Sequence, residues 1–315
     1  MLKFLIKNND LTVTELNKPF SCSISMNEDI PADALSVSFL GRLNIPEACY
    51  IQVYDDESLV FSGIIDEIRF FADDTSCYTK LTARSMAAVL LDNEAKPVSY
   101  NEVSTSVVFR NHLEPYGIKG YTGDEKTVFG KLNISKGMTN WQIFSYFCVR
   151  AFNKKPRIEA DGTASFCGLT DKGTVRFSNT DGIKYNSVKE NKKLCSEITQ
   201  VRVKFESGAD YDRKIRNAET EEKPVKRERF IDATNPSVPD TLADSIISNS
   251  YRDSYVVTLR CEGRLLGILG AGAEVFDEFI GEKKNMYVSD VSYSLSSSGE
   301  YTTVTLKRRD KNVDT

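Results

Sequence analysis

The sequence is poor in the residues that build metal sites and disulfide frameworks. It contains a single histidine, His112, and its seven cysteines form no C-x-x-C pair. The cysteines stand at positions 22, 49, 77, 148, 167, 195 and 261. An odd number of scattered cysteines argues against both a disulfide framework and a zinc site. We therefore expect reduced, mostly buried thiols in a protein made in a cytoplasm, and no cofactor.

Long apolar runs are also absent. No stretch approaches the roughly 18 uninterrupted apolar residues of a membrane-spanning helix. Near the N-terminus, Lys7 and the following Asn8-Asn9-Asp10 segment interrupt the apolar residues before the core of a signal peptide could form. We expect residues 1–7 to form a first strand, and we expect this chain to insert into no membrane.

Neither sign of charge dominates. The sequence has 45 acidic and 41 basic residues, spread along its length, for a net charge of −4. No overall field therefore draws the protein to nucleic acid or to anionic lipid, which argues against a dedicated DNA-binding protein.

What the sequence does contain is the alternation of β-strands. Apolar and polar residues alternate near the N-terminus, between polar turns, and this predicts strands over residues 36–40, 50–54, 59–71 and 78–84. A short helix is predicted to follow over residues 85–91. With 315 residues, the chain is long enough for two or three domains.

The middle of the chain changes character. Residues 105–114 predict a helix that ends at the proline and glycine beyond it. Thr139-Asn140-Trp141-Gln142 matches a capping box, and an apolar stripe at helical spacing follows it. Asp161-Gly162 predicts a two-residue hairpin turn with both residues at positive φ. This region is therefore predicted to be α+β.

Strands return in the last third of the chain. Val201, Val203 and Phe205 alternate with basic residues, and residues 255–261 alternate in the same way. Between them, residues 213–229 are rich in Glu, Lys and Arg and predict a long exposed loop. Residues 239–249 predict one more short helix.

The two ends of the chain share a pattern. Three pairs of segments match, residues 52–55 with 274–277 at an offset of 222, and residues 65–68 with 288–291 and 78–84 with 301–307 at an offset of 223. Alternation alone could produce one matching pair, but three in register favour an internal duplication over unrelated hairpins.

With this duplication in view, the chain resembles the baseplate hub proteins of contractile phage tails and phage-tail-like bacteriocins, the late-control-D or gp27-like family. The resemblance rests on the order and spacing of segments that span nearly the whole chain. These are residues 60–65 (VFSGII) leading to 81–85 (LTARS), residues 137–141 (GMTNW) opening a helix, and residues 266–272 (LGILGAG) before a late pair of strands.

The resemblance implies a mainly β fold in which two tail-tube-like, antiparallel β-barrel-like domains flank a small α+β region. We place the first tube-like domain at residues 1–95, the α+β insertion at 96–190 and the second tube-like domain at 191–315. In the family, two such domains in each of three subunits form a pseudo-six-fold ring. Two similar modules in one chain present similar edges, and a closed trimer would contain six near-equivalent units.

The implied role is structural. The homotrimer would join the six-fold tail tube protein above to the three-fold central spike protein below, with baseplate wedge proteins around it. It would have no nucleic-acid site, although DNA could pass through its lumen in a phage. The protein would belong to a phage tail or to a released extracellular particle.

The acidic and histidine candidates each have a simpler explanation. His112 would need a nucleophile or a paired acid to act as a base, and no Gly-x-Ser-x-Gly accompanies it, so we interpret it as a non-catalytic residue at a helix flank. Asp55-Asp56-Glu57 and Asp73-Asp74 could cleave glycosides or bind a divalent ion, but both fall in predicted turns. Asp161-Gly162 and Asp181-Gly182 are interpreted as turns rather than calcium loops.

Two further groups are candidate subunit-interface residues. The basic group could bind nucleic acid, but Glu219, Glu221, Glu222 and Glu228 nearly cancel its field, so we favour a charged loop, or else a contact with a neighbouring tube, spike or wedge subunit. The apolar group is too short for a core helix and is either core or a buried subunit contact. The members are Arg213, Lys214, Arg216, Lys226 and Arg227 in the first group and Leu265, Leu266, Ile268 and Leu269 in the second.

Other classes of function remain possible. Gly270-Ala271-Gly272 precedes a predicted strand rather than a helix, so it lacks the amide cluster of a phosphate loop. A baseplate-associated cell-wall hydrolase would need a cleft with two acids or a metal. A carbohydrate-binding attachment module would need an aromatic face, whereas the tyrosines and phenylalanines are mostly accounted for by strand and helix cores.

Overall fold

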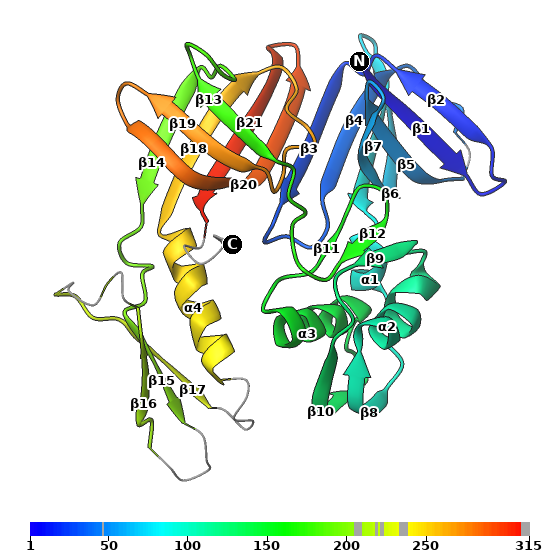
Figure 1. Cartoon of the computed structure of the whole chain (residues 1–315). Coiled ribbons are helices and arrows are strands. Elements are labelled where there is room, and N and C mark those ends of the chain that lie inside the picture. The colour runs from blue at the N-terminus through cyan, green and yellow to red at the C-terminus, as the bar shows by residue number, and fades with distance from the viewer. Residues whose placement is uncertain (46, 205–209, 218–219, 221–223, 233–238, 310–315) are drawn as a thin grey trace. The chain divides into compact units, whose positions relative to one another are not determined.

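The computed structural model describes residues 1–45, 47–204, 210–217, 220, 224–232 and 239–309, with only the helical backbone for 239–241. Within these residues the fold is mainly antiparallel β, with helices in two insertions, so the predicted fold class is confirmed (Figure 1). The five strand predictions before residue 85 and the short helix after them are also confirmed, with boundaries that differ by at most two residues.

The chain forms two compact units. Unit 1 contains Met1–Lys172, Cys261–Ala271 and Ser289–Val304, and unit 2 contains Gly173–Arg260, Gly272–Val288 and Thr305–Thr315. Three of the five boundaries between the units fall inside strands, so compactness divides the chain differently from the repeat. The domains placed at residues 1–95, 96–190 and 191–315 stay a prediction.

Seven antiparallel strands precede the first helix. They are β1 (Leu2–Asn8), β2 (Val13–Asn17), β3 (Ser21–Asn27), β4 (Ala34–Leu40), β5 (Ala48–Asp55), β6 (Ser58–Ala72) and β7 (Cys77–Ser85), in the order β3-β4-β7-β6-β5-β1-β2. Along β1 the side chains of Leu2, Phe4 and Ile6 are buried, with a period of two. The sequence reading missed β2 and β3, because their serines, threonines and asparagines obscure the alternation.

The α+β insertion follows β7. It comprises α1 (Ala87–Asp92), β8 (Val98–Ser104), α2 (Thr105–Val108), the π-helical turn η1 (Phe109–Leu113), the 3₁₀ turn η2 (Glu114–Tyr116), β9 (Gly120–Thr122), β10 (Thr127–Ile134), α3 (Asn140–Phe152), β11 (Arg157–Ile158) and β12 (Thr163–Ser165). Its core is aromatic, with Phe144, Phe147 and Phe166 fully buried and in edge contact. The insertion therefore has a core of its own, to which α1 contributes.

The capping box predicted for α3 is confirmed. The Thr139 hydroxyl accepts from the Gln142 amide at 3.2 Å, and the Gln142 side chain accepts from the Thr139 amide at 2.9 Å. Both bonds satisfy amides that the first turn of a helix leaves unpaired. The helix predicted over residues 105–114 exists, but it changes from α to π to 3₁₀ geometry before it ends at Gly117.

The hairpin predicted at Asp161-Gly162 exists with a different turn. The Gly162 amide donates to the Glu159 carbonyl at 2.9 Å, and only Gly162 has positive φ, at 86°. The two-residue turn with both positions at positive φ is therefore wrong. A type I turn followed by one left-handed residue, with glycine at that place, makes the three-residue hairpin loop instead.

A second set of strands follows the insertion. It contains β13 (Thr174–Ser178), β14 (Ser187–Lys192), β18 (Tyr255–Glu262), β19 (Gly272–Asp277), β20 (Gly281–Ser296) and β21 (Gly299–Arg308), in the order β14-β18-β21-β20-β19-β13. β13 pairs with β19 in parallel, whereas β14 with β18 and β19 with β20 are antiparallel. The predicted boundary at residue 190 lies inside β14.

A smaller layer of three strands and one helix separates β14 from β18 in the chain (Figure 1). It consists of β15 (Gln200–Lys204), β16 (Arg213–Arg216), β17 (Glu228–Asp232) and α4 (Pro239–Asp253). Val201 and Val203 of β15 and Ala243 of α4 are buried in one cluster.

The long exposed loop predicted over residues 213–229 is therefore wrong at both ends. β16 and β17 each pair with β15, so their backbone groups are satisfied by hydrogen bonds while their charged side chains remain on the surface. High charge hid the strands from a search for apolar alternation. Phe205, Glu219, Glu221 and Glu222 lie outside the described residues.

One buried ion pair ties the insertion to the first strand set. Arg157 of β11 pairs with Asp33, which directly precedes β4, and also donates to the Asn27 carbonyl at 3.2 Å. Only 6% of Arg157 and 7% of Asp33 are exposed. Burial raises the pKa of Asp33, and the guanidinium of Arg157 opposes that rise.

We expect Arg157→Met to lower the free energy of unfolding by about 3–5 kcal/mol, because it leaves a buried carboxylate without its partner. The double variant Arg157→Met/Asp33→Asn should recover much of that loss, since it removes the charge as well. Urea denaturation at neutral pH measures both. A double variant no more stable than the single one would contradict the account.

Candidate docking interface

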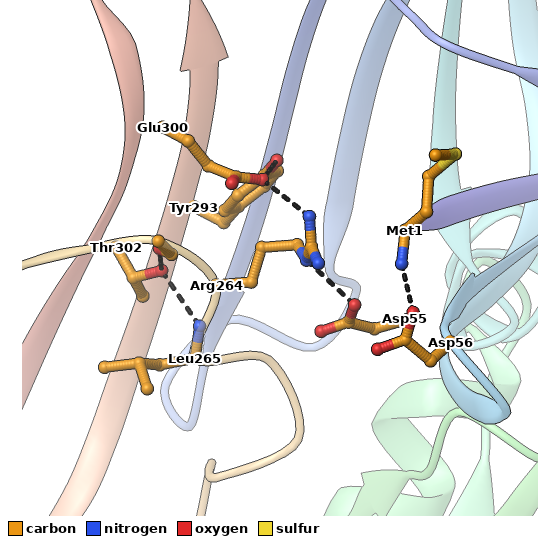
Figure 2. A network of polar contacts seen from close by, with 9 residues as sticks. Met1, Asp55, Asp56, Arg264, Leu265, Tyr293, Glu300 and Thr302 are labelled. Carbon is orange, nitrogen blue, oxygen red and sulfur yellow. Dashed lines mark hydrogen bonds and ion pairs between the residues drawn. The ribbon is translucent and has the colours of Figure 1, made fainter.

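Two turns of the chain have the same hydrogen-bond pattern. Gly41-Arg42-Leu43 follows β4, and Thr79 donates to the Gly41 carbonyl at 2.9 Å and accepts from the Leu43 amide at 3.1 Å. Gly263-Arg264-Leu265 follows β18, and Thr302 donates to the Gly263 carbonyl at 2.7 Å and accepts from the Leu265 amide at 3.1 Å (Figure 2).

The backbone agrees as well. The glycines have φ of 81° and 79°, a left-handed conformation that glycine adopts without strain. The two turns lie 222 residues apart and the two threonines 223 apart, the offsets of the sequence repeat. One local structure therefore occurs twice, at the positions that the repeat predicts.

The strand order repeats too. β3-β4-β7-β6-β5-β1 corresponds to β14-β18-β21-β20-β19-β13, position by position. β5, β6 and β7 carry the segments that match β19, β20 and β21 in sequence. The copies differ in the direction of β13, in the extra strand β2, and in the layer of β15–β17 and α4. The internal duplication inferred from sequence thus has a structural counterpart.

The two copies meet along β3 and β20. The first half of β20 pairs with β19, and its second half pairs with β3 from Asp290 opposite Asn27 to Leu295 opposite Cys22. The Asn27 side chain also donates to the Asp290 carboxylate at 2.7 Å. A strand of the first copy therefore extends the sheet of the second.

Arg264 reinforces this junction. Its Nε donates to Asp55 at the end of β5 at 2.8 Å, and its Nη1 donates to Glu300 in β21 at 3.1 Å (Figure 2). The Tyr293 hydroxyl donates to the same Glu300 oxygen at 2.6 Å. One guanidinium thus joins an acid of each copy, a geometry for which arginine is suited because its donors form a fixed fork.

The pKa values of these groups reflect the same contacts. Burial lowers the pKa of Arg264, but Asp55 and Glu300 raise it more, so it lies above its usual range. Burial, and then Glu300, raises the pKa of Tyr293. Burial raises the pKa of the Cys22 thiol to about 12, with Glu300 adding to the effect. These groups are therefore in fixed protonation states near neutral pH, and the cluster is suited to holding strands together.

The corresponding positions in the first copy are exposed. Arg42 lies over the Phe70 ring at 5.2 Å from its centroid, and no ion pair of Arg42 is present among the described residues. Ile68 and Phe70 are 42% and 46% exposed, whereas Val291 and Tyr293, 223 residues later, are fully buried. The first copy thus has the docking surface of the second without the strand that covers it.

The two groups of candidate interface residues lie in different units. Leu265, Leu266, Ile268 and Leu269 form the loop between β18 and β19 in unit 1, where Leu269 is buried and the others are half-buried. The basic group belongs to unit 2, with Arg213, Lys214 and Arg216 exposed on β16 and Lys226 and Arg227 before β17. A role for either group in subunit contacts stays a prediction.

His112 lies inside the insertion rather than at a helix flank. It is 3% exposed, its Nδ1 is 3.0 Å from the Asn140 side-chain oxygen, and its Nε2 is 3.3 Å from the Tyr100 hydroxyl. Burial lowers its pKa, with the Asn140 bond opposing. The predicted flank position is wrong because η1 turns the ring inward, and the contacts are structural.

The acidic turns have different environments. Asp73 caps the β6–β7 turn, accepting from the amides of Thr75 and Ser76 at 2.8 and 2.7 Å, as a solvated turn predicts. Asp55 differs from the solvated turn residue that the sequence predicts, because its ion pair with Arg264 keeps it half-buried. In the part of the chain that the structure describes, no three His, Cys, Asp or Glu side chains gather as a metal site. Among the same residues, no helix has the length and apolar character to span a membrane.

Sequence reading missed Arg42 and Arg264. The signal was present, because Gly-Arg-Leu occurs at residues 41–43 and again at 263–265, at the offset of the repeat. Alternation of apolar and polar residues is a property of strands and does not detect a turn of this kind. A comparison of the turns at the repeat offset would have found both arginines.

We expect Arg264→Met to lower the free energy of unfolding by about 1–2 kcal/mol, because it removes hydrogen bonds to two carboxylates. Arg42→Met is the matched control, since it changes the same residue type in the same turn on an exposed surface, and should change stability by less than about 0.5 kcal/mol. Urea denaturation of the two variants checks this. Equal losses would show that the two turns are not in different environments.

We expect His112→Gln to reduce the dependence of stability on pH. The folded state lowers the pKa of His112, so the unfolded state binds the proton first. Its contribution is present above the unfolded value of about 6.5 and is lost as the pH falls below it. Melting temperatures at pH 7.5 and 5.5 should fall more in the parent protein than in the variant, and equal falls would contradict this.

The sequence and fold of this chain can be compared with those of known proteins. No family model matches the chain, and no curated protein sequence is similar to it. Solved structures are similar over almost the whole chain. A tail protein from Neisseria meningitidis MC58 superposes with a TM-score of 0.79 at 18% identity, covering 98% of this chain and 96% of that one.

Two further solved structures are similar to almost the whole of this chain. The 43 kDa tail protein of prophage MuSo2 from Shewanella oneidensis has a TM-score of 0.79 at 14% identity, covering 97% of this chain and 98% of that one. An E. coli type VI secretion component described as similar to the T4 tail proteins gp27 and gp5 has a TM-score of 0.63 at 7% identity, covering 99% and 77%. The chain therefore has the fold of these phage tail proteins and shares it with the type VI component.

Proposed function

We propose that this chain is a structural baseplate hub subunit of a contractile injection particle. Three copies form a pseudo-six-fold ring that joins the six-fold tail tube to the three-fold central spike. The observation that carries the proposal is the duplication, because each chain holds two modules of the same strand order, joined through β3 and β20. Six equivalent modules in three chains match a six-fold neighbour on one side and a three-fold neighbour on the other.

The fold comparisons support the proposal. The proteins with TM-scores of 0.79 are tail proteins, and each is covered almost completely. The type VI component, described as similar to gp27 and gp5, extends the likeness to a second kind of injection machine. The partners proposed here are accordingly a tail tube protein, a central spike protein and baseplate wedge proteins.

The described side chains support a role without intrinsic catalysis. His112 is engaged with Asn140 and Tyr100, and Asp55 is engaged with Arg264. Asp73 satisfies the amides of its own turn. These three groups, which are among the candidates for acid–base chemistry, thus make structural contacts.

The proposal predicts a native mass three times the 35.4 kDa of one chain. Light scattering across a range of concentrations measures it, and averaged electron micrographs of the same sample give the symmetry of the ring. A species that remains monomeric at the highest concentration, or a ring without three-fold symmetry, would overturn the trimeric hub.

A further inference from the structure

The outer half of β6 is an unfilled strand position. β5 pairs with β6 only as far as Ile64, and β7 pairs along the opposite edge as far as Ala72. Among the described residues, no strand pairs with the free edge of residues 65–72. In the second copy the corresponding edge of β20 is filled, because β3 pairs with residues 290–295. A strand is therefore missing from the first copy at a place where the second copy has one.

The exposed side chains mark the same position. Ile68 and Phe70 correspond to Val291 and Tyr293, which are fully buried on the strand that β3 covers. Phe71, the next residue along β6, is 43% exposed. A free edge with exposed apolar side chains favours the addition of another strand.

The duplication identifies which strand fits. β14 is the counterpart of β3, since each stands at one end of its set and pairs with the strand that precedes a Gly-Arg-Leu turn. The edge of β14 away from β18 has no strand beside it among the described residues. Within one chain β3 already fills β20, so the strand that fills β6 belongs to a second copy.

The register follows from the strand pairs. Ser21 pairs with Ser38, three residues before Gly41, and Ser187 pairs with Arg260, three residues before Gly263. The amides of the preceding residues, Phe20 and Asn186, make the matching bonds to the Ser38 and Arg260 carbonyls. β3 and β14 are thus related by an offset of 166, and Asn27 corresponds to Lys193.

The charges are complementary in this register. Asn27 lies opposite Asp290, so Lys193 of one copy would lie opposite Glu67 of the next, whose carboxylate accepts from Arg69 in the single chain. Both side chains are exposed in the single chain. Likewise Arg264 binds Asp55, so Arg42 faces Asp277 of the neighbouring copy. Asp277 already accepts from Tyr185 and from two amides, which fixes its carboxylate at the β19–β20 turn.

We propose that β14 of a second copy of this chain adds antiparallel to the free edge of β6, with Lys193 opposite Glu67 and Asn191 opposite Arg69. The pairing repeats between chains the junction that β3 and β20 make within one. It rests on the proposed function in one respect, because a closed ring of three requires this step at every subunit boundary.

Disulfide cross-linking tests the register. Two differently tagged chains are coexpressed, one with Arg69→Cys and the other with Asn191→Cys, in a background where Cys49, Cys77, Cys167 and Cys195 are replaced by serine. Directly opposed residues of antiparallel strands have Cα atoms about 4.5–5.5 Å apart, which a disulfide spans. The matched control replaces Asn191→Cys by Lys189→Cys, which lies on the same face two residues out of register, at about 7–8 Å.

We expect mild oxidation to form mixed covalent dimers with the first pair, from up to about half of the chains when the two kinds mix at random in a trimer, and few with the second. All positions are exposed, and the ion pair that Arg69→Cys removes, with Glu67, lies on the surface, so each variant should melt close to its background. A trimer in which the first pair fails to cross-link, or in which both pairs link equally, overturns this inference and leaves the trimeric hub standing. Selective linking without a trimer supports the inference and overturns the ring, and a monomer without linking overturns both.

Discussion

The structure depends on the pairing of β3 with β20. It places a strand from the first copy of a repeated module beside a strand of the second, and Ile24, Val291 and Tyr293 on these two strands are completely buried. Full burial of a side chain such as Ile24 or Val291 contributes about 1.5–3 kcal/mol, whereas a surface ion pair contributes about 0–1. Apolar burial along the strands therefore stabilises the junction, and the half-buried Arg264 aligns it by joining Asp55 to Glu300.

The two Gly-Arg-Leu turns differ in their neighbours, since one copy of the module has a strand beside it and the other has none among the described residues. Arg42 and Arg264 occupy matching turns, yet Arg264 binds two carboxylates, whereas Arg42 lies over the Phe70 ring and has no ion pair among the described residues. The two arginines differ in the residues that lie beside them and not in the sequence of their turns. One copy of this surface is paired with a strand and the other is free. Because the strand within the chain is already used, the free copy can be paired in the same way only by a strand of another chain.

Much of this could be predicted from the sequence where one local signal dominates. Alternation found β5, β6 and β7, and the residues around Thr139 predicted the capping box of α3. The serine-rich β3 and the charged β16 were missed, because their neighbours rather than their own apolar faces make them strands. The sequence predicts Asp55 to be a solvated turn residue for the same reason, since its partner Arg264 lies 209 residues away.

The most direct test of the central claim is an electron cryo-microscopy map of the assembled protein at side-chain resolution, examined at the outer edge of β6. The account predicts β14 of a neighbouring copy along this edge, antiparallel, with Lys193 opposite Glu67. An edge that remains open in a closed assembly, or that is filled by a different segment, would contradict the claim that the junction within the chain is repeated between chains.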